Sequence, residues 1–375
     1  MFGRRTRPHA SSTQFSGANL TARRPRRPRR PRVLAPATGS VAFGTIHAAA
    51  APRAIVRLLI DGRPRGRDRA DRRGRASFRV PVEGRHRIVV RSGGRASRPV
   101  DAWLLARRQA VTGPPFSHVR VSHRLERRLR RVLAGSAQPA GAMIVNLATG
   151  RGAAVNAGAR FPAASSLKVA IAIVAAARGF DAPGSARWAV MRQMLVVSDN
   201  LAADRILGWI GGPYTVDRLL HRLGLARSFF VAGYVNPTGT LASLHVGVER
   251  EPALHTAKAT TPYELGLLLR MVHARAIGAG GGPLRRVLRG RRGRIHARRI
   301  LALLLDNADT YRAVVGWPTV PHAHKSGYNE QVQADAGIWY GPRGPILISA
   351  MVAGTNPAVL QRVGLLARRA YGGRG

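Results

Sequence analysis

The stretch FPAASSLKVAIAIVAAARG, residues 161–179, is the part of the sequence that decides the fold. Its second half is a run of apolar residues, which predicts an apolar helix. Ser165, Ser166 and Lys168 stand at the N-terminal end of that helix. An Arg would serve any surface role at this position equally well, so a Lys here requires a chemical reason. The chain has 62 Lys and Arg residues, and only three of them are lysines: Lys168, Lys258 and Lys325.

Ser165 and Lys168 are spaced so that they lie on one face of a helix, one turn apart. A Ser hydroxyl is a weak nucleophile unless a neighbouring group accepts its proton. A Lys in an apolar setting can lose its proton near neutral pH, because desolvation disfavours the ammonium. The pair therefore predicts a nucleophile and its base, while the same two residues could also be a helix cap and an ordinary lysine.

The formal net charge of the 375-residue chain is +45, which three interpretations could explain. The charge could bind nucleic acid, could bind an anionic surface such as a cell wall or lipid headgroups, or could reflect a bias toward Arg codons. The preference for Arg over Lys favours codon bias, since selection for charge alone would not avoid Lys. The sequence has no zinc-finger, RNP-like or phosphate-loop motif, so nucleic acid is not the expected partner, whereas an anionic cell-surface polymer remains open.

Three segments differ in composition. Residues 1–38 are rich in Arg and contain no acid, which predicts a disordered basic arm. Residues 39–108 hold short β-branched runs separated by turn residues, which predict a small immunoglobulin-like β-sandwich. Residues 115–375 alternate helical and strand patterns. No run approaches the ~20 apolar residues of a spanning helix, and the sequence after the arm could be a weak export signal or none. The absence of Cys excludes disulfides, thiolate metal sites and a Cys nucleophile.

Two further short motifs follow the opening helix. SDN, at residues 198–200, stands between two helical runs, where it could simply cap a helix. HKSGYNE, at residues 324–330, contains the last Lys and precedes two predicted strands. The chain thus contains three short motifs, in the order Ser165-x-x-Lys168, Ser198-Asp199-Asn200 and Lys325-Ser326-Gly327.

This order resembles the Ser-x-x-Lys, Ser-Asp-Asn and Lys-Thr-Gly signature of class A β-lactamases and penicillin-binding proteins. Ser326 replaces the Thr and keeps its hydroxyl. The flanking sequences SDNLAADRILGWIGGPYTVDRLLHRLGL, TTPYELGLLLRMV and KSGYNEQVQADAGIWY are also similar to that family. The resemblance spans roughly residues 115–375. It implies an α/β fold in which an antiparallel sheet is flanked by helices.

The resemblance also implies the roles of the residues. Ser165 would be the nucleophile, Lys168 its base, and Ser198 the proton relay to the leaving nitrogen. The backbone N–H groups of Ser165 and Tyr328 would form the oxyanion hole. Substrate binding would fall to Asn200, Lys325, Ser326, Gly327 and Tyr328. Substrates would be β-lactams or acyl-D-Ala peptides, the protein would be an extracytoplasmic monomer, and no cofactor or metal is expected.

The chain departs from the family pattern at two places. The interval between Ser165 and Ser198 is shorter than in the β-lactamases, which leaves the substrate range open. The family's β-lactamases also use a Glu to activate the water that hydrolyses the acyl-enzyme. Here only Glu249 and Glu251 lie nearby, and Glu251 is the candidate base, although a solvated loop carboxylate is the favoured interpretation of that residue. An acylation-only penicillin-binding protein or sensor, a peptidase or esterase, and a non-catalytic basic envelope-binding protein therefore remain alternatives.

Overall fold

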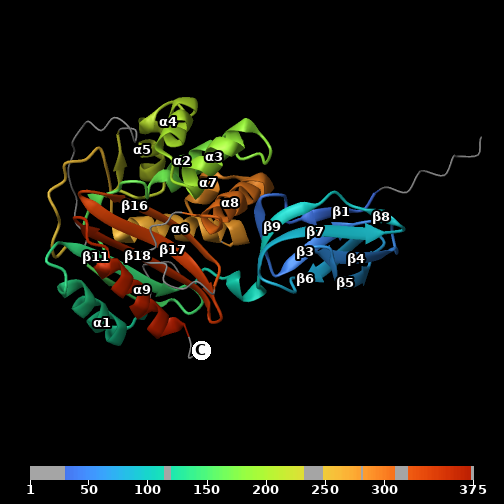
Figure 1. The fold of residues 1–375 in the computed structure, drawn as a ribbon, viewed down its shortest axis with the longest axis horizontal. Helices are drawn as coiled ribbons and strands as arrows, with labels where there is room; N and C mark the ends of the chain where they lie inside the picture. Colours follow the sequence, from blue (N-terminus) through green and yellow to red (C-terminus); the bar gives the residue numbers. More distant parts are fainter. Residues whose placement is uncertain (1–29, 114–119, 232–247, 280–281, 309–319, 373–375) are drawn as a thin grey trace, which may run out of the picture.

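The computed structural model describes residues 30–113, 120–231, 248–279, 282–308 and 320–372. Figure 1 shows an all-β unit, coloured blue to cyan, beside a larger unit of helices and strands. The short 3-10 helix η1 (Arg107–Gln109) follows the last strand of the all-β unit. In the described ranges, no helix is both long and apolar enough to cross a membrane.

The all-β unit consists of two sheets that share one hydrophobic core. One sheet has the order β1-β3-β6, and the other has the order β2-β9-β7-β4-β5, with β8 paired to β7. Alternation buries one side of several strands, as in β6, where Ala76 and Phe78 are buried and Arg75, Ser77 and Arg79 are exposed. The strands are β1 (Arg32–Ala35), β2 (Ser40–Phe43), β3 (Thr45–Ala49), β4 (Ile55–Ile60), β5 (Arg63–Arg69), β6 (Arg75–Arg79), β7 (Gly84–Ser92), β8 (Arg95–Ala96) and β9 (Val100–Leu105).

The predicted all-β segment is confirmed, but its first strand lies earlier than residue 39. β1 begins at Arg32 and pairs with β3, so the end of the segment predicted as the arm, residues 1–38, contains a strand. The Pro-spaced sequence gave no sign of this pairing because the partner strand comes later in the chain. Residues 1–29 of the predicted arm lie outside the described residues. The immunoglobulin-like character of the sandwich stays a prediction.

The larger unit is built on a six-stranded sheet of order β10-β12-β11-β18-β17-β16, beside a small sheet of order β13-β15-β14. Its strands are β10 (Arg120–Val121), β11 (Ala140–Asn146), β12 (Arg151–Val155), β13 (Phe161–Pro162), β14 (Phe229–Phe230), β15 (Lys258–Thr260), β16 (His322–Asn329), β17 (Val332–Gly341) and β18 (Gly344–Ala353). Its helices are α1 (His123–Ala134), α2 (Lys168–Ala177), α3 (Ala186–Val196), α4 (Asn200–Trp209), α5 (Pro213–Arg222), α6 (Pro262–Ile277), α7 (Leu284–Val287), α8 (Gly290–Leu305) and α9 (Ala358–Tyr371).

Helices cover both faces of the large sheet, which gives three layers. Along β11, Met143 and Val145 belong to the core shared with α2 to α8. The alternate residue Ile144 belongs to the core shared with α1 and α9. Helix α2 lies inside the first of these cores, and all but the last of its residues are buried. A helix that is apolar on every side is expected at such a central position. The predicted α/β fold, with an antiparallel sheet flanked by helices, is thus confirmed.

The all-β unit docks on the larger unit through Asp306, which caps the C-terminus of α8. The indole N–H of Trp103 on β9 donates a hydrogen bond to Asp306 at 2.8 Å. The guanidinium of Arg192 on α3 lies 3.1 Å from the same carboxylate, and that of Arg85 on β7 lies 3.6 Å away. One acidic side chain therefore connects three elements from the two units.

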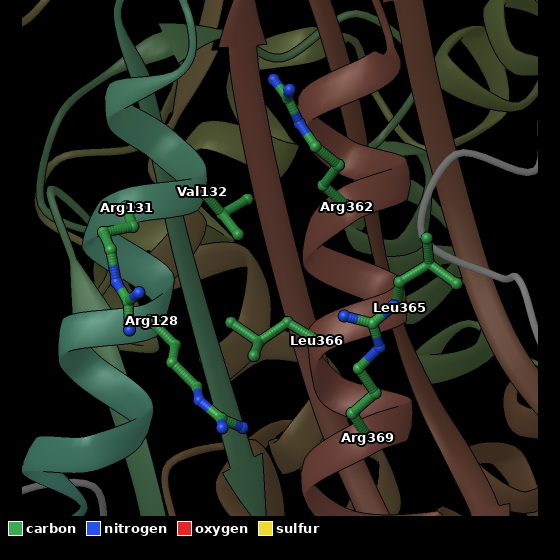
Figure 2. Close-up of a pocket in the computed structure, with 7 residues that line it drawn as sticks. All are labelled: Arg128, Arg131, Val132, Arg362, Leu365, Leu366 and Arg369. Carbon is green, nitrogen blue, oxygen red and sulfur yellow. The ribbon is translucent and has the colours of Figure 1, made fainter.

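A basic groove of about 570 Å³ runs between α1 and α9, on the face of the large sheet opposite to α2 (Figure 2). In the part of the chain that the structure describes, its arginines form no ion pair with a carboxylate. The residues that line the groove are Arg128, Arg131, Val132, Arg362, Leu365, Leu366 and Arg369. None of them belongs to the three motifs, so this basic surface is separate from the motif residues.

The packing of α1 on the sheet generates a test of the fold. Leu129 is fully buried, and truncation to Ala should lower the free energy of unfolding by about 2–5 kcal/mol, since the cavity would persist. Urea denaturation followed by circular dichroism would measure the change. Arg127→Ala, at an exposed position of the same helix, is the control and should change stability by less than about 0.5 kcal/mol. Equal effects of the two variants would contradict this packing.

Candidate active site

The turn before α2 holds Ser165 in a strained backbone. Ala164, immediately before it, has a φ of +43°, a left-handed value that costs a non-glycine residue about 1–3 kcal/mol. The turn is held by the carbonyl of Ala163, which accepts hydrogen bonds from the Ser166 N–H at 3.0 Å and from the Ser166 hydroxyl at 2.6 Å. Ser165 itself is partly exposed while Ser166 is fully buried. Of the two adjacent hydroxyls, only that of Ser165 can face a ligand.

Lys168 is the first residue of α2 and is fully buried. Its Nζ donates hydrogen bonds to the backbone oxygen of Ser198 at 2.5 Å and to Asn200 Oδ1 at 2.6 Å. The Ser198 hydroxyl lies 3.5 Å from the same nitrogen. The first two motifs, separated along the sequence, therefore meet at one amine.

The Ser198–Asn200 segment is the junction between α3 and α4. Ser198 has a φ of +61°, a second left-handed non-glycine residue in this region. Asp199 is the N-cap of α4, and its carboxylate accepts the N–H of Ala202 at 2.7 Å. The cap fixes the start of α4, and the strained residue before it turns the Ser198 carbonyl toward Lys168. Asp199 is thus the predicted helix cap, and it also positions Ser198 and Asn200.

The third motif lies on β16, the edge strand of the large sheet. Lys325 and Ser326 are fully buried, and Tyr328 is about half exposed at 52%. Gly327 passes very close to the turn that carries Ser165. A Cβ on Gly327 would lie 2.7 Å from the Ser166 nitrogen and 2.8 Å from the Ser165 nitrogen, closer than real Cβ contacts. Only Gly allows β16 to approach this turn.

The electrostatic environment favours a neutral Lys168. Burial, and next the charge of Lys325, lower the pKa of the Lys168 amine to about 7. The charge of Lys258 acts in the same direction, and the charges of Asp199 and Asp204 oppose it. Lys168 also stands at the N-terminus of α2, where the helix dipole disfavours a cation. A lysine in this state can accept a proton near neutral pH, which a surface lysine cannot.

Two further residues of this region were not assigned by the sequence analysis. Lys258 on β15 is buried, and burial lowers the pKa of its amine. Asp204 on α4 interacts electrostatically with both Lys168 and Lys258. The signal for Lys258 was the scarcity of lysine. The signal for Asp204 was its position four residues after Asn200, on the same face of α4.

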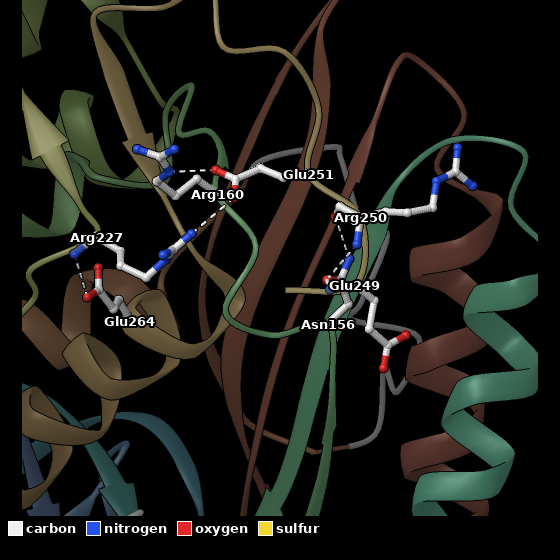
Figure 3. Close-up of polar contacts among 7 residues, drawn as sticks. All are labelled: Asn156, Arg160, Arg227, Glu249, Arg250, Glu251 and Glu264. Carbon is white, nitrogen blue, oxygen red and sulfur yellow. Dashed lines mark hydrogen bonds and ion pairs between the residues drawn. The ribbon is translucent and has the colours of Figure 1, made fainter. Parts of the chain in front are cut away.

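Glu251, the predicted water-activating residue, is held by two arginines (Figure 3). Its carboxylate lies 2.5 Å from Arg160 Nε and 3.0 Å from an Arg227 guanidinium nitrogen. Glu249 pairs instead with Arg130 of α1 at 2.7 Å. Each oxygen of Glu251 is thus occupied by a cationic donor, which disfavours a role as a base. Residues 232–247 of the same loop lie outside the described residues.

A family model described as the Beta-lactamase enzyme family matches residues 124–181 and 186–372. The chain belongs to the β-lactamase enzyme family. The predicted family is therefore confirmed, over the unit that contains the three motifs. Among curated proteins, no sequence matches this chain.

Solved structures share the fold at low sequence identity. PBP-A is 20% identical with a TM-score of 0.51, covering 69% of this chain and 98% of that one. A β-lactamase from Streptosporangium roseum is 22% identical with a TM-score of 0.50, covering 66% and 98%. A mutant of PBP-A, solved as an acyl-enzyme complex with penicillin G, is 20% identical with a TM-score of 0.50, covering 69% and 97%. At these identities the likeness establishes the fold alone.

The close approach of β16 to the Ser165 turn yields a prediction. Gly327→Ala should slow labelling by a fluorescent penicillin on the order of 10²-fold, because the added Cβ must displace the backbone around Ser165. Gly208→Ala, where a Cβ on α4 meets open space, should label like the wild type. Gel fluorescence against time measures both rates. Wild-type labelling of Gly327→Ala would show that the contact does not shape the site.

Proposed function

We propose that this chain is a serine hydrolase of the class A β-lactamase type, which opens β-lactams through an acyl-enzyme on Ser165. One observation carries the proposal. The amine of Lys168 is buried three residues after Ser165, at the start of α2, and its pKa is lowered to about 7. Membership of the β-lactamase family and the meeting of the motifs support it. By the same family relation, we place the reaction outside the cytoplasm.

The hydrogen bonds of Lys168 suit it to the role of base. A neutral amine has two hydrogens and one lone pair. The Ser198 carbonyl and Asn200 Oδ1 accept from this amine and can take both hydrogens. The lone pair would then accept the proton of the Ser165 hydroxyl. An Arg at this position would stay protonated in a protein, which explains a Lys in a chain that otherwise uses Arg.

In the proposed acylation, the Ser165 oxygen bonds to the carbonyl carbon of the ring amide as its proton passes to Lys168. The negative charge that develops on the carbonyl oxygen would be stabilised by the backbone N–H groups of Ser165 and Tyr328. The carbonyl then re-forms and the C–N bond breaks. Ser198 protonates the leaving nitrogen and recovers a proton from Lys168, which returns to its neutral state.

Substrate binding would use the remaining motif residues. Lys168 occupies Oδ1 of Asn200, so the amide NH₂ of this exposed side chain is free to donate to the carbonyl of a substrate amide. Lys325 and Ser326, next to Gly327 on β16, would bind the substrate carboxylate. The same arrangement suits a β-lactam and an acyl-D-Ala peptide, since both place an amide near a carboxylate.

A second candidate, an acylation-only or slowly deacylating penicillin-binding protein, is favoured by the position of Glu251. The two arginines occupy the carboxylate that would activate the hydrolytic water. A missing general base costs about 10²–10⁴ in rate, so the acyl-enzyme should form faster than it is hydrolysed. PBP-A, which shares this fold, has been solved in mutant form as an acyl-enzyme with penicillin G.

The identity of the nucleophile can be tested with adjacent serines. Ser165→Ala should abolish covalent labelling by a fluorescent penicillin, while circular dichroism shows an intact fold. Ser166→Ala is the matched control, because the Ser166 hydroxyl is buried and donates to Ala163, so this variant should still label. Labelling of Ser165→Ala at the wild-type rate would refute the assignment.

The role of Lys168 predicts a pH dependence. Only the neutral amine accepts a proton, so the acylation rate should rise with pH and level off above a midpoint near the Lys168 pKa of about 7. Stopped-flow acylation measured over about pH 5 to 9 would give the profile. Lys168→Met should lose the rise of the acylation rate with pH, together with most of that rate. A wild-type rate that does not change across this range would exclude Lys168 as the base.

The place of Glu251 can be tested by mass spectrometry of the intact protein. Glu251→Gln should leave both the acylation burst and the steady-state hydrolysis unchanged. It should lower stability by about 1–3 kcal/mol, because Arg160 and Arg227 lose charged acceptors. Glu249→Gln, which breaks a more exposed pair, should cost less than about 1 kcal/mol. Accumulation of acyl-enzyme only in Glu251→Gln would restore Glu251 as the deacylating base.

A further inference from the structure

The residues that follow α8 join the all-β unit to the active site. Asp306, the C-cap of α8, accepts the indole N–H of Trp103 on β9 at 2.8 Å and pairs with Arg192 on α3 at 3.1 Å. Its side chain is only 10% exposed. A carboxylate at a helix C-terminus is disfavoured by the helix dipole, so these donors are what stabilise it there. We call residues 306–308 the bridging segment.

The other two residues of the bridging segment bind the backbone beside two of the motifs. The side-chain amide of Asn307 donates to the carbonyl of His324 at 3.0 Å, immediately before the Lys-Ser-Gly motif. The backbone N–H of Ala308 donates to the carbonyl of Val196 at 2.9 Å, two residues before the Ser-Asp-Asn motif. Because the three residues are consecutive, a shift of Asp306 would move both hydrogen bonds.

These hydrogen bonds act where the active-site backbone depends on external support. β16 is the edge strand and pairs with β17 alone among the strands of the large sheet, so its other edge is held by groups such as Asn307. Gly327, three residues after His324, is the point at which β16 meets the Ser165 turn. Ser198 has a strained φ of +61°, which persists only when surrounding contacts hold it. Both motifs therefore depend on where the bridging segment lies.

The all-β unit is packed firmly enough to hold the bridging segment in place. Val41 and Leu105 are fully buried in the same hydrophobic core as α2, and Trp103 packs against that core. The ring of Phe43 meets that of His273 on α6 edge-on, with the ring centroids 5.7 Å apart. The family match begins at residue 124, so this support comes from outside the matched region.

We propose that the all-β unit is a positioning element of the active site: Trp103 holds Asp306, and the bridging segment then holds the backbone beside Ser198 and Lys325. This inference rests on the proposed function for what the positioned groups do, and on the contacts alone for the coupling itself. Trp103, Asp306 and Asn307 are positioning residues, which act through the two motifs and need no contact with the substrate.

Hydrogen exchange of the full-length protein, read by mass spectrometry, tests the coupling without any substrate. Trp103→Phe removes the indole N–H and keeps an aromatic ring, so exchange should become faster in residues 192–200 and 322–329. Arg85→Ala is the matched control, because Arg85 approaches the same carboxylate from the all-β unit at 3.6 Å with a mostly exposed side chain. This control should exchange like the wild type in both segments.

Acylation by penicillin provides a second readout. The rate constant at saturating penicillin should fall on the order of tenfold in Trp103→Phe and in Asn307→Ala, because both misplace groups of the site. The double variant should react about as slowly as the slower single variant, since the two residues act through one segment. A merely structural role would lower the labelled fraction and leave the rate constant of the folded molecules unchanged.

A conservative substitution carries the test if Trp103→Phe does not fold. Asp306→Asn keeps an acceptor for the indole, so residues 192–200 and 322–329 should exchange more slowly in this variant than in Asp306→Ala. Exchange that changes only within residues 100–105, or wild-type rate constants in Trp103→Phe and Asn307→Ala, would overturn the inference. A wild type that does not react with penicillin would instead overturn the proposed function, and the exchange measurement would still decide the coupling.

Discussion

The amine of Lys168 is the point at which three distant parts of the chain meet. It belongs to α2, and it donates hydrogen bonds to Ser198 and Asn200 at the start of α4. The charge of Lys325 on β16 lowers its pKa. Such an amine can be buried only if acceptors are supplied for its hydrogens and its charge is reduced. Both conditions are met by backbone and side-chain groups that the surrounding helices and strands hold in place.

The central position of α2 follows from this constraint. The helix is buried on every side, so any change in its depth would move Lys168 and the Ser165 turn together. The large sheet fixes its β16 edge against that turn, through the close contact of Gly327. Strained residues occur at Ala164 and Ser198, next to the groups that must point at one another. Strain of this kind persists when the surrounding structure over-determines the backbone.

The loop that carries Glu251 is held in place by ion pairs with arginines. Its two ion pairs tie the loop to Arg160 and Arg227, and Glu264 accepts the backbone N–H of Arg227 at 2.8 Å (Figure 3). In a chain with 17 acidic residues against 62 basic ones, each carboxylate is surrounded by potential partners. A carboxylate in such a loop is more readily used to hold arginines than left free to activate water. The excess of arginine thus affects which carboxylates are available for catalysis, as well as the charge of the protein surface.

The sequence by itself determined the apolar helix in the second half of residues 161–179, the strand pairs and the three motifs, because these depend on local periodicity and on short spacings. It also showed that lysine is rare, which was the signal for Lys258. Only the tertiary structure decided that Lys168 meets Ser198 and Asn200, that Glu251 is paired with two arginines, and that β1 begins at Arg32. Each of these depends on contacts between segments far apart in sequence. Their register is set by how the sheets and helices pack, and no local pattern encodes it.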